Sequence, residues 1–227
     1  MQKILIVGAG FMGSGIAQVS AQAGYQVHLM DIRTAITDRA LKEIRWSLEK
    51  LAAKGTLPEP VEKILARIAV EQDLSCASEM DWVIEAATEA EELKRSIFRE
   101  LDQVSMPKTP LATNTSSIPI TLLALNTRRP ERVLGLHFFG PVPLMKLVEV
   151  VKGEKTSPEI FERGVAFAQS LGKTPVRVQQ DIPGFVMNRI FSAALREAVD
   201  LVDRGIATPE DVDVGMRLGY GWNVGPF

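Results

Sequence analysis

Apolar residues follow two spacings in the first 182 residues, and the two spacings alternate along the chain. Short apolar runs typical of buried strands occupy residues 3–7, 26–31, 67–70, 81–86, 110–113, 132–137, 144–151 and 175–178. Between them, apolar positions three and four residues apart predict helices over 34–54, 61–66, 91–102 and 158–171, and an apolar helix precedes Gly24. Alternating strands and helices predict an α/β domain over 1–182, with a mostly parallel sheet and helices on both faces.

The pattern changes at the segment 183–185. From there to Gly205 the sequence predicts one apolar helix, and Thr208 is expected to cap a second helix with Pro209 at its first position. We therefore place a domain boundary near Pro183 and expect 183–227 to begin an all-helical domain. Two helices of this size cannot bury their own apolar faces, so we expect them to dock elsewhere, or the chain to be truncated.

Composition and charge narrow the classes of partner. Hydrophobic residues make up 46% and charged residues 24% of the 227, which is ordinary for a globular protein. A net charge of −2 gives no electrostatic case for nucleic acid or an anionic membrane, and no stretch approaches the ~20 apolar residues of a membrane span. No secretory signal is evident. The single cysteine fits a reducing compartment, so we expect a cytoplasmic protein, and we expect no bound metal.

A glycine pattern lies between the first strand and the first helix. Gly8, Gly10 and Gly13 form G-x-G-x-x-G, with Phe11 and Met12 between the last two glycines. This spacing is typical of a Rossmann-type turn, in which the backbone and the helix N-terminus bind a pyrophosphate. Asp31 ends the second strand, where an acid binds the adenosine ribose and would repel the 2′-phosphate of NADP. The sequence therefore predicts NAD, although a glycine turn that only packs is the alternative.

Two polar segments end predicted strands, where ligands bind in open α/β sheets. His137 ends one strand, and Glu149 follows within an apolar run, so we expect a hydrogen bond between them that fixes the imidazole tautomer. A buried pair that only joins two strands is the alternative. Ser116 follows another strand, where Ser116 or Ser117 could cap the helix near Pro119, or a serine could contact a substrate. His28, the only other histidine, is expected to pack within its strand.

Ser47 and Lys54 share one face of the predicted helix 34–54, because they are seven residues apart. That face could meet a phosphate-bearing ligand. A solvated basic helix explains the same spacing without a ligand.

Five motifs in this order resemble the L-3-hydroxyacyl-CoA dehydrogenases: GAGFMGSGIA, NTSS, HFF-PVPLMKLVEVV, PGFVMNR and the closing GPF. The resemblance covers essentially the whole chain. It implies oxidation of (S)-3-hydroxyacyl-CoA by NAD and a homodimer when the helical domain is complete. It also implies roles for single residues, which are catalysis for His137, Glu149, Ser116 and Asn188, coenzyme A contacts for Ser47 and Lys54, and cofactor contacts for Glu89, Lys94 and Asn114.

The chain departs from the family at two places. Gly140 stands where the family has asparagine, which leaves space that a water could fill, and the chain stops at Phe227, before the rest of the helical domain. Two alternatives therefore stay open, another hydroxyacid dehydrogenase of the same architecture and a relative that binds NAD without catalysis.

Overall fold

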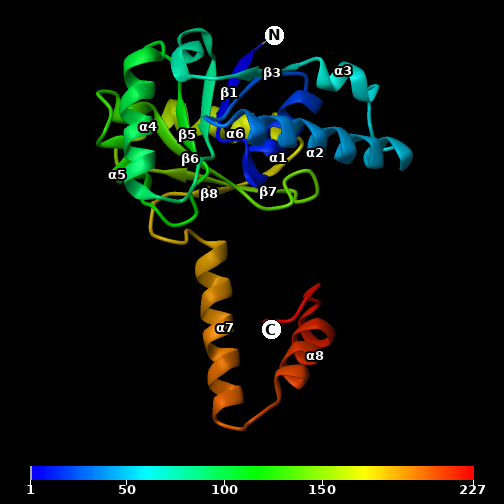
Figure 1. Cartoon of the computed structure of the whole chain (residues 1–227). Helices are drawn as coiled ribbons and strands as arrows, with labels where there is room; N and C mark the ends of the chain where they lie inside the picture. Colours follow the sequence, from blue (N-terminus) through cyan, green and yellow to red (C-terminus); the bar gives the residue numbers. More distant parts are fainter. Residues whose placement is uncertain (1) are drawn as a thin grey trace. The chain divides into compact units, whose positions relative to one another are not determined.

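The computed structural model describes residues 2–227 and divides into two compact units, of which the first ends at Ile182 and the second is Pro183–Phe227. The first unit contains a sheet (Figure 1) of eight strands, which are in the order β3-β2-β1-β4-β5-β6-β7-β8. The strands are β1 (Lys3–Val7), β2 (Gln26–Met30), β3 (Ile68–Glu71), β4 (Trp82–Glu85), β5 (Leu111–Thr113), β6 (Val133–Phe138), β7 (Leu147–Lys152) and β8 (Thr174–Val178).

Neighbouring strands run parallel everywhere except between β6 and β7. The predicted mostly parallel sheet is therefore confirmed. The six strands from β3 to β6 end at the same edge, and this edge carries the residues that follow Val7, Met30, Glu85 and Thr113. The antiparallel β7 returns from that edge, which places the residues at its start beside the end of β6.

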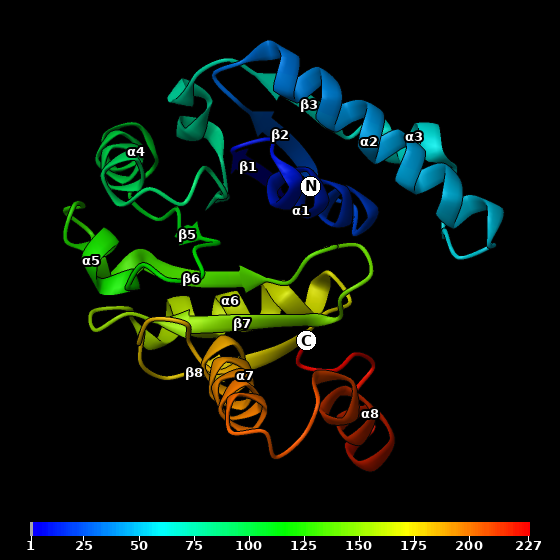
Figure 2. The same ribbon diagram turned by 60° about the horizontal axis from the view of Figure 1, so that its bottom comes forward.

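Helices cover both faces of the sheet (Figure 2). They are α1 (Phe11–Gln22), α2 (Thr34–Ala53), α3 (Val61–Leu65), α4 (Glu91–Val104), α5 (Ile120–Ala124) and α6 (Pro158–Ser170), with short 3-10 helices at η1 (Leu74–Glu79) and η2 (Pro130–Arg132). Buried residues of α1, α2, α3 and α6 share one core with the sheet, and α4 and α5 lie on the opposite side (Figures 1 and 2).

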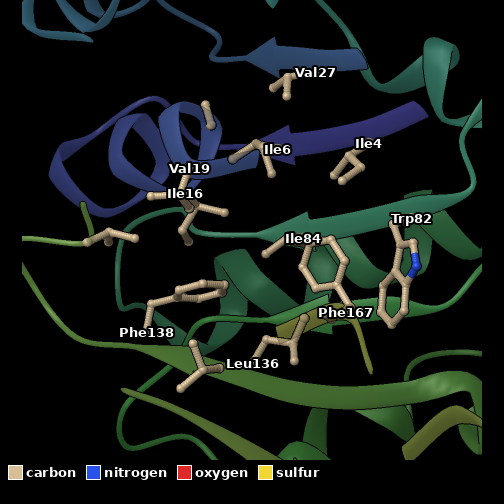
Figure 3. Packing of buried hydrophobic residues seen from close by; sticks show 14 of the residues in the cluster. Ile4, Ile6, Ile16, Val19, Val27, Trp82, Ile84, Leu136, Phe138 and Phe167 are labelled. Carbon is tan, nitrogen blue, oxygen red and sulfur yellow. The ribbon is translucent and has the colours of Figure 1, made fainter. Parts of the chain in front are cut away.

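The main core lies between α1, α6 and the strands they cover (Figure 3). Ile4 and Ile6 of β1 point to the same face because strand side chains alternate, and Ile16 of α1 packs there with them. The ring of Trp82 on β4 stacks on Phe167 of α6, with 5.1 Å between ring centroids. This stack lies at the start of β4 and packs α6 against the sheet.

One strand begins later in the structure than the sequence predicts. The apolar run 144–151 was expected to be a strand throughout, but β7 begins at Leu147. Leu144 and Met145 instead form a turn in which both backbone N–H groups donate to the Pro141 carbonyl, at 2.9 and 3.0 Å. Lys173 directly precedes β8, and its ammonium donates to the carbonyls of Val142 and Met145, at 2.6 and 2.7 Å. These hydrogen bonds stabilise the turn.

The second unit is helical, as expected. It contains α7 (Met187–Asp203) and α8 (Pro209–Tyr220), and the Thr208 hydroxyl accepts a hydrogen bond from the Asp211 N–H at 3.1 Å, which confirms the predicted cap. Within this unit the rings of Phe191 and Trp222 approach to 6.4 Å. Among residues 2–227, none of the helices has both the length and the apolar composition that crossing a membrane would need.

Candidate active site

The glycine turn after β1 is shaped to bring a ligand close to the backbone. A side chain at Gly8, whose φ is +102°, would meet the Ala86 carbonyl oxygen at 2.6 Å, and one at Gly13 would meet the Gly8 oxygen at 1.8 Å. A Cβ at Gly10 would find no atom within 4 Å. Two glycines are thus needed for packing, while the third leaves open space beside the N-terminus of α1, which has no side-chain cap. This geometry fits a pyrophosphate.

Asp31 lies beside this turn at the end of β2. One carboxylate oxygen accepts a hydrogen bond from the Ala9 N–H at 3.0 Å, and the other accepts from the Arg33 N–H at 3.1 Å. The Asp31 carboxylate is therefore hydrogen-bonded directly to the glycine turn. The residues present fit NAD.

A buried ion pair lies beneath the ends of β4 and β5. Glu85 is fully buried, and its carboxylate accepts hydrogen bonds from the Lys94 ammonium at 2.6 Å and from the Thr113 hydroxyl at 2.7 Å. Lys94 also donates to the Ala87 carbonyl at 3.2 Å. Because Lys94 is 1% exposed, the structure places this expected cofactor contact below the surface, where it supports the loop after β4.

Glu89 organises the loop that contains Ser116. Its carboxylate accepts hydrogen bonds from the Thr115 and Ser117 hydroxyls and from the Ser116 N–H, at 2.5, 2.9 and 3.0 Å. Partial burial acts to raise the pKa of Glu89, but these hydrogen bonds and the charge of Lys94 outweigh it and hold the pKa below its ordinary value. Glu89 is therefore a carboxylate that fixes the loop's backbone.

The expected hydrogen bond between His137 and Glu149 is confirmed. The two residues are directly opposite in the antiparallel β6–β7 pair, and Nδ1 of His137 lies 2.7 Å from Oε2 of Glu149. His137 is 4% exposed and Glu149 is fully buried. A carboxylate accepts, so Nδ1 carries the proton and, in the neutral imidazole, Nε2 is left with the lone pair.

Ser116 approaches that second nitrogen. Its Oγ lies 3.1 Å from Nε2 of His137, although the residues are 21 positions apart in the chain. The alternative that Ser116 or Ser117 caps the next helix is wrong, because α5 begins after Pro119 and has no side-chain cap. Glu149, His137 and Ser116 thus form one hydrogen-bonded chain that runs from the core to the edge of the sheet.

Asn114 and Gly140 shape the loop on either side of this chain. The side-chain oxygen of Asn114 accepts a hydrogen bond from the Phe138 N–H at 2.9 Å, which joins the ends of β5 and β6. A Cβ at Gly140 would meet Cε1 of Phe11 at 2.5 Å and Sδ of Met12 at 3.4 Å. The space that we expected a water to fill therefore belongs to the Phe11 ring.

A pocket of about 700 Å³ opens beside this loop. Phe11 and residues 141–144 line it on one side, and α2 lines it on the other with both Ser47 and Lys54. The prediction that these two residues share one face is confirmed. The lining is apolar near the loop, whereas the α2 side contains the cations Arg39, Lys50 and Lys54 and one carboxylate, Glu43.

Two further residues named from the sequence, Asn188 and His28, take no part in these hydrogen bonds. Asn188 is the second residue of α7 and belongs to the second unit. His28 does more than pack, because its Nδ1 lies 2.7 Å from Oε1 of Glu71 on the neighbouring strand β3.

Sequence reasoning missed Glu85 and Lys173. Glu85 ends the apolar strand DWVIEA, and this is the same signal, a carboxylate in an apolar run, that drew attention to Glu149. Lys173 is 9% exposed and binds two carbonyls. Its sequence neighbours give no sign of a partner some 30 residues away.

Comparison with known proteins agrees with this geometry. The family described as 3-hydroxyacyl-CoA dehydrogenase, NAD binding domain, matches residues 3–182, and the corresponding C-terminal domain matches residues 184–227. A probable 3-hydroxybutyryl-CoA dehydrogenase of Bacillus subtilis is 44% identical over all of this chain and 79% of its own length. The human mitochondrial hydroxyacyl-coenzyme A dehydrogenase is 43% identical over all of this chain and 74% of its own length.

A solved structure gives the same result in three dimensions. The crystal structure of (S)-3-hydroxybutyryl-CoA dehydrogenase from Ralstonia eutropha matches all of this chain and 80% of its own, with a TM-score of 0.95 and 40% identity. Identity at this level over the whole chain, together with matches to both domains, establishes the family. The chain belongs to the 3-hydroxyacyl-CoA dehydrogenase family of NAD-dependent oxidoreductases.

Proposed function

We propose that this dehydrogenase interconverts (S)-3-hydroxyacyl-CoA and 3-oxoacyl-CoA with His137 as the general acid–base. The observation that carries the proposal is the hydrogen-bonded chain from buried Glu149 through His137 to Ser116. Glu149 holds the proton on Nδ1, so Nε2 of the neutral imidazole can accept the proton of a substrate hydroxyl. When bound, NAD supplies the ring that accepts the hydride.

Ser116 is proposed to orient the reacting oxygen. Its hydroxyl lies 3.1 Å from Nε2 of His137, so a substrate oxygen placed between them would receive hydrogen bonds from both groups in the reductive direction. Fixed donors of this kind stabilise charge that develops on the oxygen. Glu89 holds the Ser116 backbone, so Ser116 does not need to reorganise during the reaction.

Cofactor contacts are proposed for the turn and the loops around it. Gly8, Gly10 and Gly13, with Phe11 and Met12 at the start of α1, would receive the pyrophosphate, and Asp31 would receive the adenosine ribose. Glu89 and Asn114 would border the nicotinamide half. Lys94 would act through Glu89, whose carboxylate lies 3.4 Å from its ammonium.

Ser47 and Lys54 are proposed to contact coenzyme A, since both line the pocket that opens beside the loop after His137. Asn188, which belongs to the second unit, is proposed as a catalytic residue on the ground of the family resemblance. A cytoplasmic location is also proposed, on the ground that the chain has a single cysteine.

A homodimer is proposed from the surface of the helical unit. Ile190, Phe191 and Val199 of α7 and Val214 and Leu218 of α8 are all exposed. Exposed apolar residues on two neighbouring helices are typical of subunit contacts. Sedimentation equilibrium is expected to give a dimer, and a monomer at micromolar concentration would contradict this part of the proposal.

The proposed reaction is tested by offering the two enantiomers of 3-hydroxybutyryl-CoA with NAD in separate assays. We expect NADH to form with the (S) enantiomer and not with the (R) enantiomer, because the hydroxyl must face Nε2 of His137 while the pocket fixes the rest of the substrate. Equal rates with both would contradict the proposed arrangement. A protein that binds NAD and oxidises neither would be the non-catalytic relative.

A further inference from the structure

Two large aromatic side chains stand exposed on the lining of the pocket. Phe11 is 64% exposed and Trp46 is 63% exposed. Phe11 lies against Gly140, beside the reacting end of the proposed site. Trp46 lies on α2 and contributes nothing to the described core, although an indole left in water loses the free energy that its burial would supply. An exposed indole in a pocket is better explained by a ligand that covers it.

Two lysines share the surface of α2 with this indole. Trp46, Lys50 and Lys54 follow one another at intervals of four residues, so their side chains form a row on the helix. The Lys50 ammonium lies 5.7 Å from the centre of the Trp46 ring, within the range of a cation–π contact. Neither lysine forms an ion pair within residues 2–227, whereas Arg39 in the same pocket is paired with Glu43.

The row therefore offers a flat aromatic surface followed by two cations that have no acid partner in the part of the chain that the structure describes. From Trp46 to Lys54 the helix rises about 12 Å, at 1.5 Å per residue. An aromatic ring recognises a nucleobase by stacking, and adjacent lysines recognise its phosphates. The other side of the pocket is apolar and borders the loop after His137, where an acyl chain would react.

We propose that Trp46 stacks on the adenine of coenzyme A and that Lys50 joins Lys54 in binding its phosphates. This inference rests on the proposed acyl-CoA chemistry and extends it to two residues. Lys50 holds the indole through its cation–π contact, so the stacking surface is ordered before the base arrives. The affinity for coenzyme A is then supplied by α2, away from the reacting atoms.

The test compares two substrates that share the reacting group. Acetoacetyl-CoA contains the nucleotide, whereas the acetoacetyl thioester of N-acetylcysteamine lacks it. We expect Trp46→Leu to raise the KM for acetoacetyl-CoA about 10-fold with kcat unchanged, which is the size of one lost base–aromatic stack. The KM for the truncated thioester should not change. Trp46→Phe, which keeps an aromatic ring, should recover most of the loss.

The control is Leu125→Ala, which removes an equally exposed apolar side chain next to α5 and should leave both KM values unchanged. A rise in both KM values on Trp46→Leu would mean that Trp46 only shapes the pocket, and no rise in either would mean that the base lies elsewhere. Each result overturns the inference.

Calorimetric titration with free coenzyme A keeps this test separate from the proposed reaction. We expect Trp46→Leu to raise the Kd for coenzyme A about 10-fold. We expect Lys50→Met also to raise this Kd, by a larger factor at low salt than at high salt. An equal Kd in wild type and Trp46→Leu overturns the inference whatever the activity. A wild type that binds coenzyme A but reduces neither thioester would contradict the reaction alone.

Discussion

Single residues at the end of β6 decide whether the site can move a proton. His137 has a carboxylate on one nitrogen and a hydroxyl on the other, and both partners are fixed by strand register or by Glu89. The sequence alone predicted the pair His137–Glu149, because a carboxylate in an apolar run needs a partner. It left the role of Ser116 open, since local hydrogen bonding of serine is equally compatible with a helix cap.

Gly140 stands where the family resemblance implies an asparagine, and the Phe11 ring lies where a Cβ would be. We expect Gly140→Ala to lower kcat/KM several-fold, because the exposed Phe11 ring must turn away from the pocket. Gly140→Asn displaces the same ring but adds an amide near His137, so its kcat/KM should exceed that of Gly140→Ala by about the worth of one hydrogen bond, ~1 kcal/mol or several-fold.

Steady-state rates with acetoacetyl-CoA for the three proteins decide between these effects. If the asparagine variant is no faster than the alanine variant, the amide contributes nothing. If it is thousands of times faster than an almost inert wild type, the chain is a relative that lost catalysis.

At the scale of elements, the spacing of apolar residues was sufficient to predict those helices whose structure depends on neighbouring residues in the sequence. It predicted α2, α4, α6 and the cap of α8, since each of these depends on an apolar face or on one capping side chain. It failed at residues 144–146, where an apolar run is a turn rather than a strand. Lys173, distant in sequence, donates to the carbonyls of that turn, and no local pattern contains such information.

Lys173 is therefore predicted to matter for both stability and substrate binding. Burial lowers the pKa of Lys173, yet its ammonium serves two carbonyls of the turn that lines the pocket. Lys173→Met keeps the apolar stem and leaves those carbonyls without their charged donor, so we expect a loss of about 1.5–3 kcal/mol in the free energy of unfolding. The KM for acetoacetyl-CoA should rise more than kcat falls, because His137 is held by β7.

Urea unfolding measures the stability, and Lys155→Met serves as control because Lys155 is exposed. The control should change the free energy of unfolding by less than ~0.5 kcal/mol. Equal stability of Lys173→Met and Lys155→Met would show that the turn does not depend on the ammonium.

At the scale of the whole molecule, the candidate cofactor-binding and catalytic residues of the first unit lie at one edge of the sheet. The turn after β1, Asp31 after β2, Glu89 after β4, Ser116 after β5 and His137 at the end of β6 lie in different parts of the sequence, and the parallel strand order brings them to the same edge. Ligands bind at this edge in open α/β sheets. The fold class could thus be predicted from the sequence, whereas the buried pair Glu85–Lys94 depends on the folded arrangement.

The central claim is that Glu149 and His137 act as one catalytic unit. The most direct test measures acetoacetyl-CoA-dependent oxidation of NADH by wild type, His137→Gln and Glu149→Gln. The affinity of each protein for NADH is measured in parallel. We expect His137→Gln to lower kcat by about 10²–10⁴-fold, the usual worth of general acid–base catalysis, and Glu149→Gln to lower kcat as well, while both variants bind NADH nearly as wild type does. A Glu149→Gln protein that unfolds without a specific catalytic loss, or a His137→Gln protein with wild-type kcat, would contradict the claim.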